Sequence, residues 1–400
     1  WRTRALGRVA RMTTFQVPDL DQPTSGASSG ATTPPTTNPE PTPTPPRTVL
    51  LKRRVLGASS RLGILNGIRD SKWRQRRLLI LCYHSVSIED EHEWSGTYSM
   101  SPAVLESRFR MLRDGGYNVL PLDEAIRRLY ERTLPPRSVV LTFDDGMFDF
   151  RARALPLLKQ FGFPATVYWT TFYAEYQKPI FKLFCAYVLW RARARMPHPD
   201  TRPILGRQSD WNLATEDGRR RALREIMDFV YQERRFRLPE RSAVAERLTD
   251  LLGEDYEALR AKRILTVMTP EEVAEIAREG VDVQLHTHRH RTPNDHALFQ
   301  REITDNRNRI DPIRVGVARH FCYPSGEYLP QFLPWLREAG VQTATTCDPG
   351  LASFKTEPLL LPRLVDTSGL SALDVEGWMS GMSALFMPRK ARAHGHPAHV

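Results

Sequence analysis

The chain has 400 residues, of which 41% are hydrophobic and 26% charged, enough for one large α/β domain with additions. No apolar run has the length of a membrane-spanning helix, because the best candidate, residues 180–190, is too short and contains Lys182. The four cysteines are scattered along the chain. We therefore expect buried free thiols and neither a disulfide scaffold nor a CxxC metal site.

The net charge of +11 lies mainly in the first 80 residues, which hold 14 Lys/Arg against 4 Asp/Glu. The remainder is close to neutral, so the composition does not predict a nucleic-acid partner. Residues 1–48 are predicted to be a disordered basic arm rich in proline and threonine. We expect a solvated arm, with peripheral contact to an anionic surface as the alternative. The first residue is not methionine, which leaves a signal peptide open.

Strand-like and helix-like segments alternate after this arm. A helix is predicted to follow Ser101 as N-cap, with Pro102 at its first position. We expect strands over residues 78–83, 117–120, 138–143, 164–170, 281–286, 320–324 and 341–346. Further helices are predicted over residues 152–163, 270–280, 297–310 and 329–340. Repeated strand–helix units predict parallel pairing, in an open sheet or a closed barrel.

Residues 172–266 break this alternation, because their pattern is mainly amphipathic and helical. We interpret them as a helical insertion. Their aromatic residues are expected to form core rather than a sugar-binding surface, and their arginine runs to be solvated faces rather than phosphate sites.

Polar residues follow four of the predicted strands directly. These are Tyr83-His84-Ser85, Asp144-Asp145-Gly146, the stretch from His286 to His290, and Tyr323-Pro324-Ser325-Gly326. In parallel α/β folds the carboxyl ends of the strands lie at one face, where active sites are built. The sequence therefore predicts that the four motifs converge.

The adjacent Asp144 and Asp145 repel each other unless a cation or hydrogen-bond donors meet them. Two imidazoles, from His286 and His290, and one carboxylate suit zinc or a neighbouring first-row ion and leave a position open for water. Successive side chains on a strand point to opposite sides, so one aspartate can bind metal while the other accepts a proton. Gly146 permits the tight turn that this requires. The pattern predicts a catalytic metal site.

The motifs Thr142–Gly146, His286–His290 and Cys322–Gly326 resemble the first three motifs of the polysaccharide deacetylases, the NodB-homology carbohydrate esterases. The resemblance covers residues 76–365 apart from the insertion and leaves 366–400 as a C-terminal extension. It implies a distorted (β/α) barrel and one divalent ion, usually zinc, with cobalt or nickel as alternatives. The implied reaction is hydrolysis of N-acetyl or O-acetyl groups on a glycan, in the cell envelope, the periplasm or outside the cell.

The resemblance also implies a role for each motif residue. Asp144 matches the catalytic base, and Asp145, His286 and His290 match the metal ligands. Loop support is expected from Thr142, Gly146 and Thr287, and substrate or oxyanion contacts from Tyr323, Pro324, Ser325 and Gly326.

Two departures from the family pattern concern the catalytic residues. Cys322 stands where the family commonly has an arginine that braces the base, and Arg319, three residues upstream, is the candidate replacement. No late Leu-x-His motif follows residue 340. Instead, the stretch from Tyr83 to Val86 resembles an early Tyr-His motif of the exopolysaccharide-processing branch, which implies His84 as the general acid.

Two other classes of protein remain as alternatives. A sugar-nucleotide-dependent glycosyltransferase could use the Asp-Asp pair for a cation, but it would have no use for the histidine pair. A catalytically silent carbohydrate-binding relative would be expected to lack Asp144 or a metal ligand, and none is missing. The sequence predicts no oligomeric state.

Overall fold

The computed structural model describes residues 47–232 and 238–386. Most of the predicted arm, residues 1–46, lies outside these ranges, as does the end of the chain. The main sheet has eight strands in the order β10-β1-β5-β6-β7-β8-β9, with β4 pairing β5, and every pairing is parallel. The strands are β1 (Leu79–Tyr83), β4 (Asn118–Val119), β5 (Ser138–Phe143), β6 (Thr166–Trp169), β7 (Asp282–Leu285), β8 (His320–Cys322), β9 (Thr343–Thr345) and β10 (Leu364–Val365).

One late segment connects the two edges of this sheet. The backbone of residues 358–361 bonds to Ala344 in β9 and to Thr346 just after it, and a parallel bridge joins Thr345 to Leu361. Three residues later, β10 pairs with β1. The sheet is therefore closed by a single irregular strand, and the predicted distorted (β/α) barrel is confirmed.

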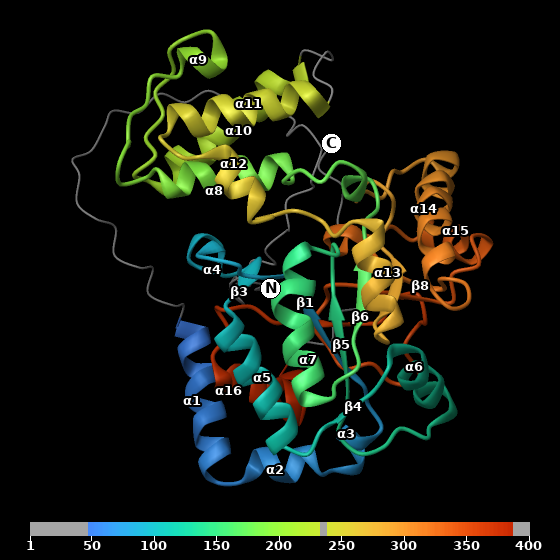
Figure 1. Ribbon diagram of the computed structural model, residues 1–400. Helices are drawn as coiled ribbons and strands as arrows, with labels where there is room; N and C mark the ends of the chain where they lie inside the picture. Colours follow the sequence, from blue (N-terminus) through green and yellow to red (C-terminus); the bar gives the residue numbers. More distant parts are fainter. Residues whose placement is uncertain (1–46, 233–237, 387–400) are drawn as a thin grey trace, which may run out of the picture.

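Helices surround the sheet (Figure 1). They are α1 (Arg47–Arg61), α2 (Ile64–Arg69), α3 (Lys72–Gln75), α4 (Glu91–Trp94), α5 (Pro102–Asp114), α6 (Leu122–Glu131), α7 (Leu155–Phe161), α13 (Pro270–Arg278), α14 (His296–Ile310), α15 (Phe332–Glu338), α16 (Ala372–Ser380) and α17 (Met382–Leu385). The Ser101 side chain caps α5 as predicted, accepting a bond from the Val104 N–H at 3.3 Å. No element was predicted at α6, although its buried residues follow a helical spacing.

Strand register explains why the motifs meet. Tyr83 at the end of β1 lies opposite Phe143 at the end of β5, and the Asp144 N–H donates to the Tyr83 carbonyl at 2.9 Å. Trp169 at the end of β6 likewise lies opposite Leu285 at the end of β7. The residues that follow these strands therefore emerge at one end of the sheet.

The segment between β6 and α13 forms η2 (Tyr173–Glu175), α8 (Phe181–Arg191), α9 (Arg202–Leu205), α10 (Glu216–Gln232), α11 (Leu238–Leu251) and α12 (Tyr256–Ala261). Figure 1 shows α8–α12 together at the top of the molecule, beyond the carboxyl ends of β5 and β6. The Tyr187 ring meets Trp94 edge-on, with 5.6 Å between centroids, and Arg191 pairs with Asp90. The helices thus rest on the loop that follows His84.

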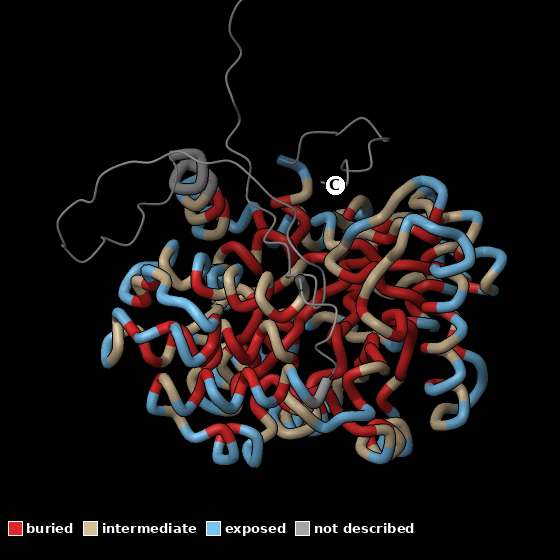
Figure 2. The backbone as a smooth tube through the Cα atoms, turned by 90° about the horizontal axis from the view of Figure 1, so that it is seen from above, coloured by how far each residue is buried: buried red, intermediate tan, exposed pale blue. Residues whose placement is uncertain are grey.

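Buried residues run through the centre of the molecule, and exposed residues lie on the outer turns (Figure 2). The strands of the sheet contribute a nearly continuous apolar core, which is typical of parallel sheets covered on both faces. Across residues 47–232 and 238–386, no helix is both long and apolar enough to cross a bilayer.

We predict that Phe299→Ala lowers the free energy of unfolding by about 3–5 kcal/mol. Phe299 on α14 is fully buried and stacks on Phe332 with 4.8 Å between ring centroids. The matched control is Leu298→Ala, at a neighbouring position that is 47% exposed, with an expected change below about 0.5 kcal/mol. Urea denaturation measures both, and equal losses would contradict the packing described here.

Candidate metal centre and catalytic site

The two aspartates leave β5 through a tight turn. Asp145 and Gly146 both have left-handed backbone conformations, with φ of 67° and 72°, and the Gly146 N–H donates to the Asp144 carbonyl at 2.8 Å. A Cβ at position 146 would lie 2.3 Å from Cδ1 of Trp169, so only glycine fits. The turn aims the two buried carboxylates at different partners. Thr142 steadies the strand behind it by donating to the Leu81 carbonyl at 2.8 Å.

Asp145, His286 and His290 form a buried cluster whose ligand atoms lie within 4.8 Å of one another. Oδ1 of Asp145 is 3.2 Å from Nε2 of His286 and 3.1 Å from Nε2 of His290. Nδ1 of His286 lies 2.9 Å from the Cys322 carbonyl, which can only accept, so Nδ1 carries the ring proton. Nε2 therefore presents a lone pair to a carboxylate oxygen. Two acceptors in contact need a cation between them, and this donor set fits a divalent metal ion.

Electrostatics keep Asp145 ionised. Burial alone would raise its pKa, but His290 and His286, when protonated in the absence of a metal ion, outweigh burial and hold the pKa well below its usual range. The second oxygen, Oδ2, accepts a hydrogen bond from the Tyr98 hydroxyl at 3.0 Å. Tyr98 thereby orients the carboxylate so that Oδ1 faces the histidines.

The histidine loop is held by α14. Asn306 is fully buried; its Oδ1 accepts from the His286 N–H at 2.9 Å, and its Nδ2 donates to the Trp169 carbonyl at 3.0 Å. Thr287 takes a left-handed conformation, and its hydroxyl accepts from the Arg291 N–H at 3.0 Å. One helix residue thus connects the end of β6 to the first histidine, and Thr287 fixes the shape of the loop.

Asp144 is paired with an arginine that sequence analysis missed. The two terminal guanidinium nitrogens of the fully buried Arg363 donate to the Asp144 carboxylate at 2.7 Å, one to each oxygen. Burial would raise the pKa of Asp144, but Arg363 more than offsets burial and lowers it. The thiols of Cys82 and Cys322 also approach Oδ2, at 3.4 and 3.3 Å.

Arg319 does not take the role that we expected of it. It pairs with Asp123 at 2.8 Å on the surface. Arg319 precedes β8, whereas Asp144 follows β5, so the two lie at opposite ends of a parallel sheet. The three residues of β8 span about 10 Å. Arg319 is close to the third motif in sequence, but this strand places it at the amino end of the sheet, away from Asp144.

His84 lies beside the aspartate pair, with Nε2 3.8 Å from Oδ2 of Asp144 and its ring 5.7 Å from the Tyr98 ring. Burial lowers the pKa of His84, although Asp144 and Asp145 oppose this change. The imidazole is therefore neutral near pH 7 and ready to receive a proton.

The third motif forms a one-turn helix, η4 (Pro324–Gly326), after β8. Ser325 and Gly326 have left-handed conformations, and a Cβ at Gly326 would lie 2.6 Å from Cβ of Cys347. Pro324 is buried. Tyr323 is buried as well, and its hydroxyl donates to the Leu359 carbonyl at 3.1 Å, so this side chain supports the closing segment.

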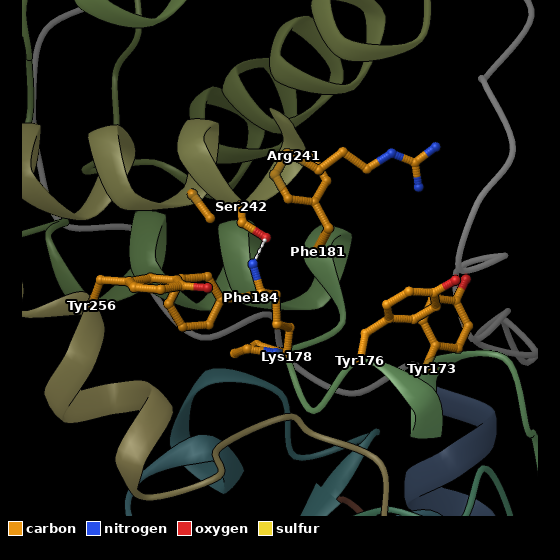
Figure 3. A pocket seen from close by; sticks show the side chains of 10 residues that line it. Tyr173, Tyr176, Lys178, Phe181, Phe184, Arg241, Ser242 and Tyr256 are labelled. Carbon is orange, nitrogen blue, oxygen red and sulfur yellow. Dashed lines mark hydrogen bonds between the residues drawn. The ribbon is translucent and has the colours of Figure 1, made fainter. Parts of the chain in front are cut away.

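A separate pocket lies within the helical segment (Figure 3). Its lining comprises Tyr173, Tyr176, Lys178, Pro179, Phe181, Phe184, Arg241, Ser242, Ala245 and Tyr256. Nζ of Lys178 donates to the Ser242 hydroxyl at 2.7 Å, and the Phe184 ring meets Tyr256 edge-on. None of the aspartates or histidines above contributes to it, so the pocket is distinct from the candidate catalytic site.

The comparisons with known proteins agree with this geometry. The family model described as "Polysaccharide deacetylase" matches residues 131–188 and 248–344, which contain Asp144, Asp145, His286 and His290. This part of the chain, which holds the aspartate and histidine motifs, is therefore similar to the polysaccharide deacetylases. His84, Tyr98 and Arg363 lie outside the matched residues, as does most of the helical segment.

The chain is similar to two known proteins, one by sequence over a short stretch and one by its fold. Poly-beta-1,6-N-acetyl-D-glucosamine N-deacetylase of Escherichia coli (strain K12) is 32% identical over 100 residues, which is 24% of this chain and 14% of that protein. The chain thus spans a small part of this curated relative. The Streptococcus pyogenes deacetylase PplD, solved in complex with acetate, superposes with a TM-score of 0.50 at 19% identity, covering 76% of this chain and 98% of that one. At this identity the likeness concerns the fold.

We predict that Asp145→Asn abolishes stoichiometric metal binding. The amide keeps the shape but loses the charge that two imidazoles face. Removing a residue that only hydrogen-bonds to a metal ligand typically lowers metal affinity about 10–100-fold. Removing a ligand itself is therefore expected to lower it by at least about 100-fold. Metal content after gel filtration measures this. His288→Ala is the control, because His288 bonds to Thr171 at 2.8 Å and lies outside the ligand cluster; equal metal loss would contradict the assignment.

We predict that Arg363→Met lowers the free energy of unfolding by about 3–5 kcal/mol, because it leaves Asp144 buried without its cation. Arg319→Met is the matched control: its ion pair is exposed, and the expected change is below about 1 kcal/mol. Chemical denaturation at pH 7.5 measures both variants. A larger loss for the Arg319 variant would contradict the pairing of Asp144 with Arg363.

Proposed function

We propose that this chain removes acetyl groups from a glycan by hydrolysis that depends on one divalent ion. The observation that carries the proposal is the contact of the Asp145 carboxylate with two imidazole nitrogens, beside a second buried carboxylate and a neutral histidine. Zinc is the first expectation, with cobalt or nickel as alternatives, because the ligands are two nitrogens and one oxygen. When bound, such an ion supplies a water whose pKa is lowered toward about 7.

In this proposal Asp144 accepts the proton of the attacking water. Arg363 fixes both carboxylate oxygens and lowers the pKa of Asp144, so the carboxylate holds the proton only transiently. Nε2 of His84, 3.8 Å away, is the more basic neighbour and receives it. His84 then protonates the leaving group, an amine for an N-acetyl substrate. We assign the backbone N–H of Ser325, at the carboxyl end of β8, to the developing oxyanion.

The substrate class follows from the acid. An amine is a poor leaving group without a proton, whereas many esters leave without one, so a positioned histidine favours an N-acetylated sugar over an O-acetylated one. The name of the Escherichia coli relative supports this choice. Residues 173–261, with the pocket of Figure 3, stand beyond the strand ends, and we propose that they shape access for the glycan.

The two alternative classes fit the geometry less well. A glycosyltransferase that binds a nucleotide through carboxylates has no need of two imidazoles on Asp145. A silent relative has no need of a base held by a buried arginine. We place the reaction in the cell envelope, the periplasm or outside the cell. Contact of the basic N-terminal segment with an anionic surface remains a proposal, since residues 1–46 lie outside the described ranges.

We predict that the metal-loaded protein releases acetate from N-acetylated glucosamine oligomers and that chelation stops this until zinc or cobalt is restored. Asp144→Asn should keep the ion and lose about 10²–10⁴-fold in turnover, as expected for a general base. His84→Ala should also keep the ion and lose amide hydrolysis more than hydrolysis of an activated acetyl ester.

The measurements are acetate release, metal content and kinetics on both substrate types. Full activity after exhaustive chelation would overturn the metal-dependent mechanism. Loss of the ion in Asp144→Asn with retention in Asp145→Asn would reverse the roles of the two aspartates.

A further inference from the structure

Two short strands apart from the main sheet carry the residue proposed as the acid. β2 (Ser85–Val86) pairs with β3 (Ser99–Met100) in parallel, and His84 is the single residue between β1 and β2. The orientation of His84 therefore depends on what fixes β2. β3 pairs with one edge of β2, and the other edge of β2 is open to other partners.

A third buried carboxylate fixes that side. Asp149 is 3% exposed and lies just before the π-helical turn η1 (Phe150–Ala154). Its Oδ2 accepts a hydrogen bond from the Ser85 hydroxyl at 2.6 Å, and its Oδ1 accepts from the Val86 N–H at 3.0 Å. Both residues that follow His84 are thus held by one side chain that comes from the chain just beyond the metal-binding aspartate.

A line of hydroxyl groups extends this attachment. Ser85 Oγ lies 3.1 Å from Ser99 Oγ, which lies 2.9 Å from Ser87 Oγ, and the latter accepts from the His92 N–H at 2.9 Å. At pH 8 the carboxyl group of Asp149 is ionised and can only accept, so the Ser85 proton points to Asp149. Ser99 then donates to Ser85, and Ser87 to Ser99. Each hydroxyl therefore donates to the next group in the line, and the last acceptor is Asp149.

We propose that Asp149 is a positioning residue for the general acid: it holds the turn after His84 so that the imidazole lies beside Asp144 and the leaving group. The inference rests on the proposed function. It concerns the leaving-group proton and not metal binding, since the described contacts of Asp149 are with Ser85 and Val86 and not with the ligand cluster.

The electrostatic cost of Asp149 supports a role beyond folding. Burial raises its pKa to about 7, and Glu91 and Asp145 add to this, while the bonds from Ser85 and Val86 oppose it. A carboxyl whose pKa is higher in the folded state stabilises the fold when protonated, and this contribution is lost as pH rises through about 7. At pH 8 the charge is thus a burden on stability, so an uncharged asparagine is expected to leave the melting temperature unchanged or higher.

The test uses Asp149→Asn and Ser85→Ala in the metal-loaded protein at pH 8. We expect both variants to keep the metal content and KM of the wild type. Turnover of an N-acetylated glucosamine oligomer should fall by about tenfold or more, while turnover of an activated acetyl ester changes less than about twofold, because a general acid matters most for a poor leaving group. Ser85→Thr, which keeps the hydroxyl, should restore amide turnover.

A double variant and a matched control make the test specific. If Asp149 acts through His84, adding Asp149→Asn to His84→Ala should cause no further loss on the amide. Glu91→Gln is the control: Glu91 is the other buried carboxylate of this region, bonded to the Glu89 N–H at 2.7 Å, and its variant should keep the amide-to-ester ratio of the wild type.

Different results would overturn the proposed function and the positioning role of Asp149. A wild-type protein that binds metal but hydrolyses neither substrate would overturn the proposed function. An active wild type whose Asp149→Asn and Ser85→Ala variants lose both substrates equally, or neither, would overturn the positioning role alone. A crystal structure of Asp149→Asn with the His84 ring in an unchanged place would do the same without any activity measurement.

Discussion

Two neighbouring carboxylates at the end of one strand determine how the rest of this site is built. Asp144 and Asp145 are both buried, and neither can be charged there without a cation. The turn at Gly146 sends them to different partners, so each finds its own. Asp145 faces two imidazoles and the place of a metal ion, and Asp144 faces the guanidinium of Arg363. The two adjacent carboxylates can therefore both be charged, because each faces a different positively charged partner.

Arg363 connects the closure of the barrel to the charge of Asp144. Residues 358–361 bond to β9 and β10 pairs with β1, so Arg363 lies in the strand that joins the two edges. Its Nε donates to the Thr346 carbonyl at 3.0 Å, and its other nitrogens reach Asp144. A misplaced closing strand would leave Asp144 buried and uncompensated. The ionised Asp144 therefore favours the closed arrangement, and the closed arrangement keeps Asp144 ionised.

Residues that directly follow a strand could be predicted from the sequence. A residue that pairs with a partner far away in the chain could not. His84, Asp145 and His286 follow strands, and parallel pairing brings such residues to one end of the sheet. Arg363 was missed because its partner lies in another part of the chain. The available signal was an arginine inside the apolar run LLLPRLV, since an arginine buried with such neighbours must be paired. Arg319 was chosen by proximity in sequence, which places it at the wrong end of β8.

Residues with no motif of their own complete the site, and they share a physical reason for escaping notice. Tyr98 acts through a hydroxyl from the turn before β3, and Asn306 acts through an amide from α14. A periodicity pattern records only that such positions are polar. Their role is visible only from their partners. Tyr98 donates to the second carboxylate oxygen of Asp145, and the strand directly after it, β3, pairs with the strand that follows His84. The Asp145 carboxylate and the proposed acid are therefore both held by this small sheet and the turn before β3, so a shift of that sheet would move both together relative to Asp144.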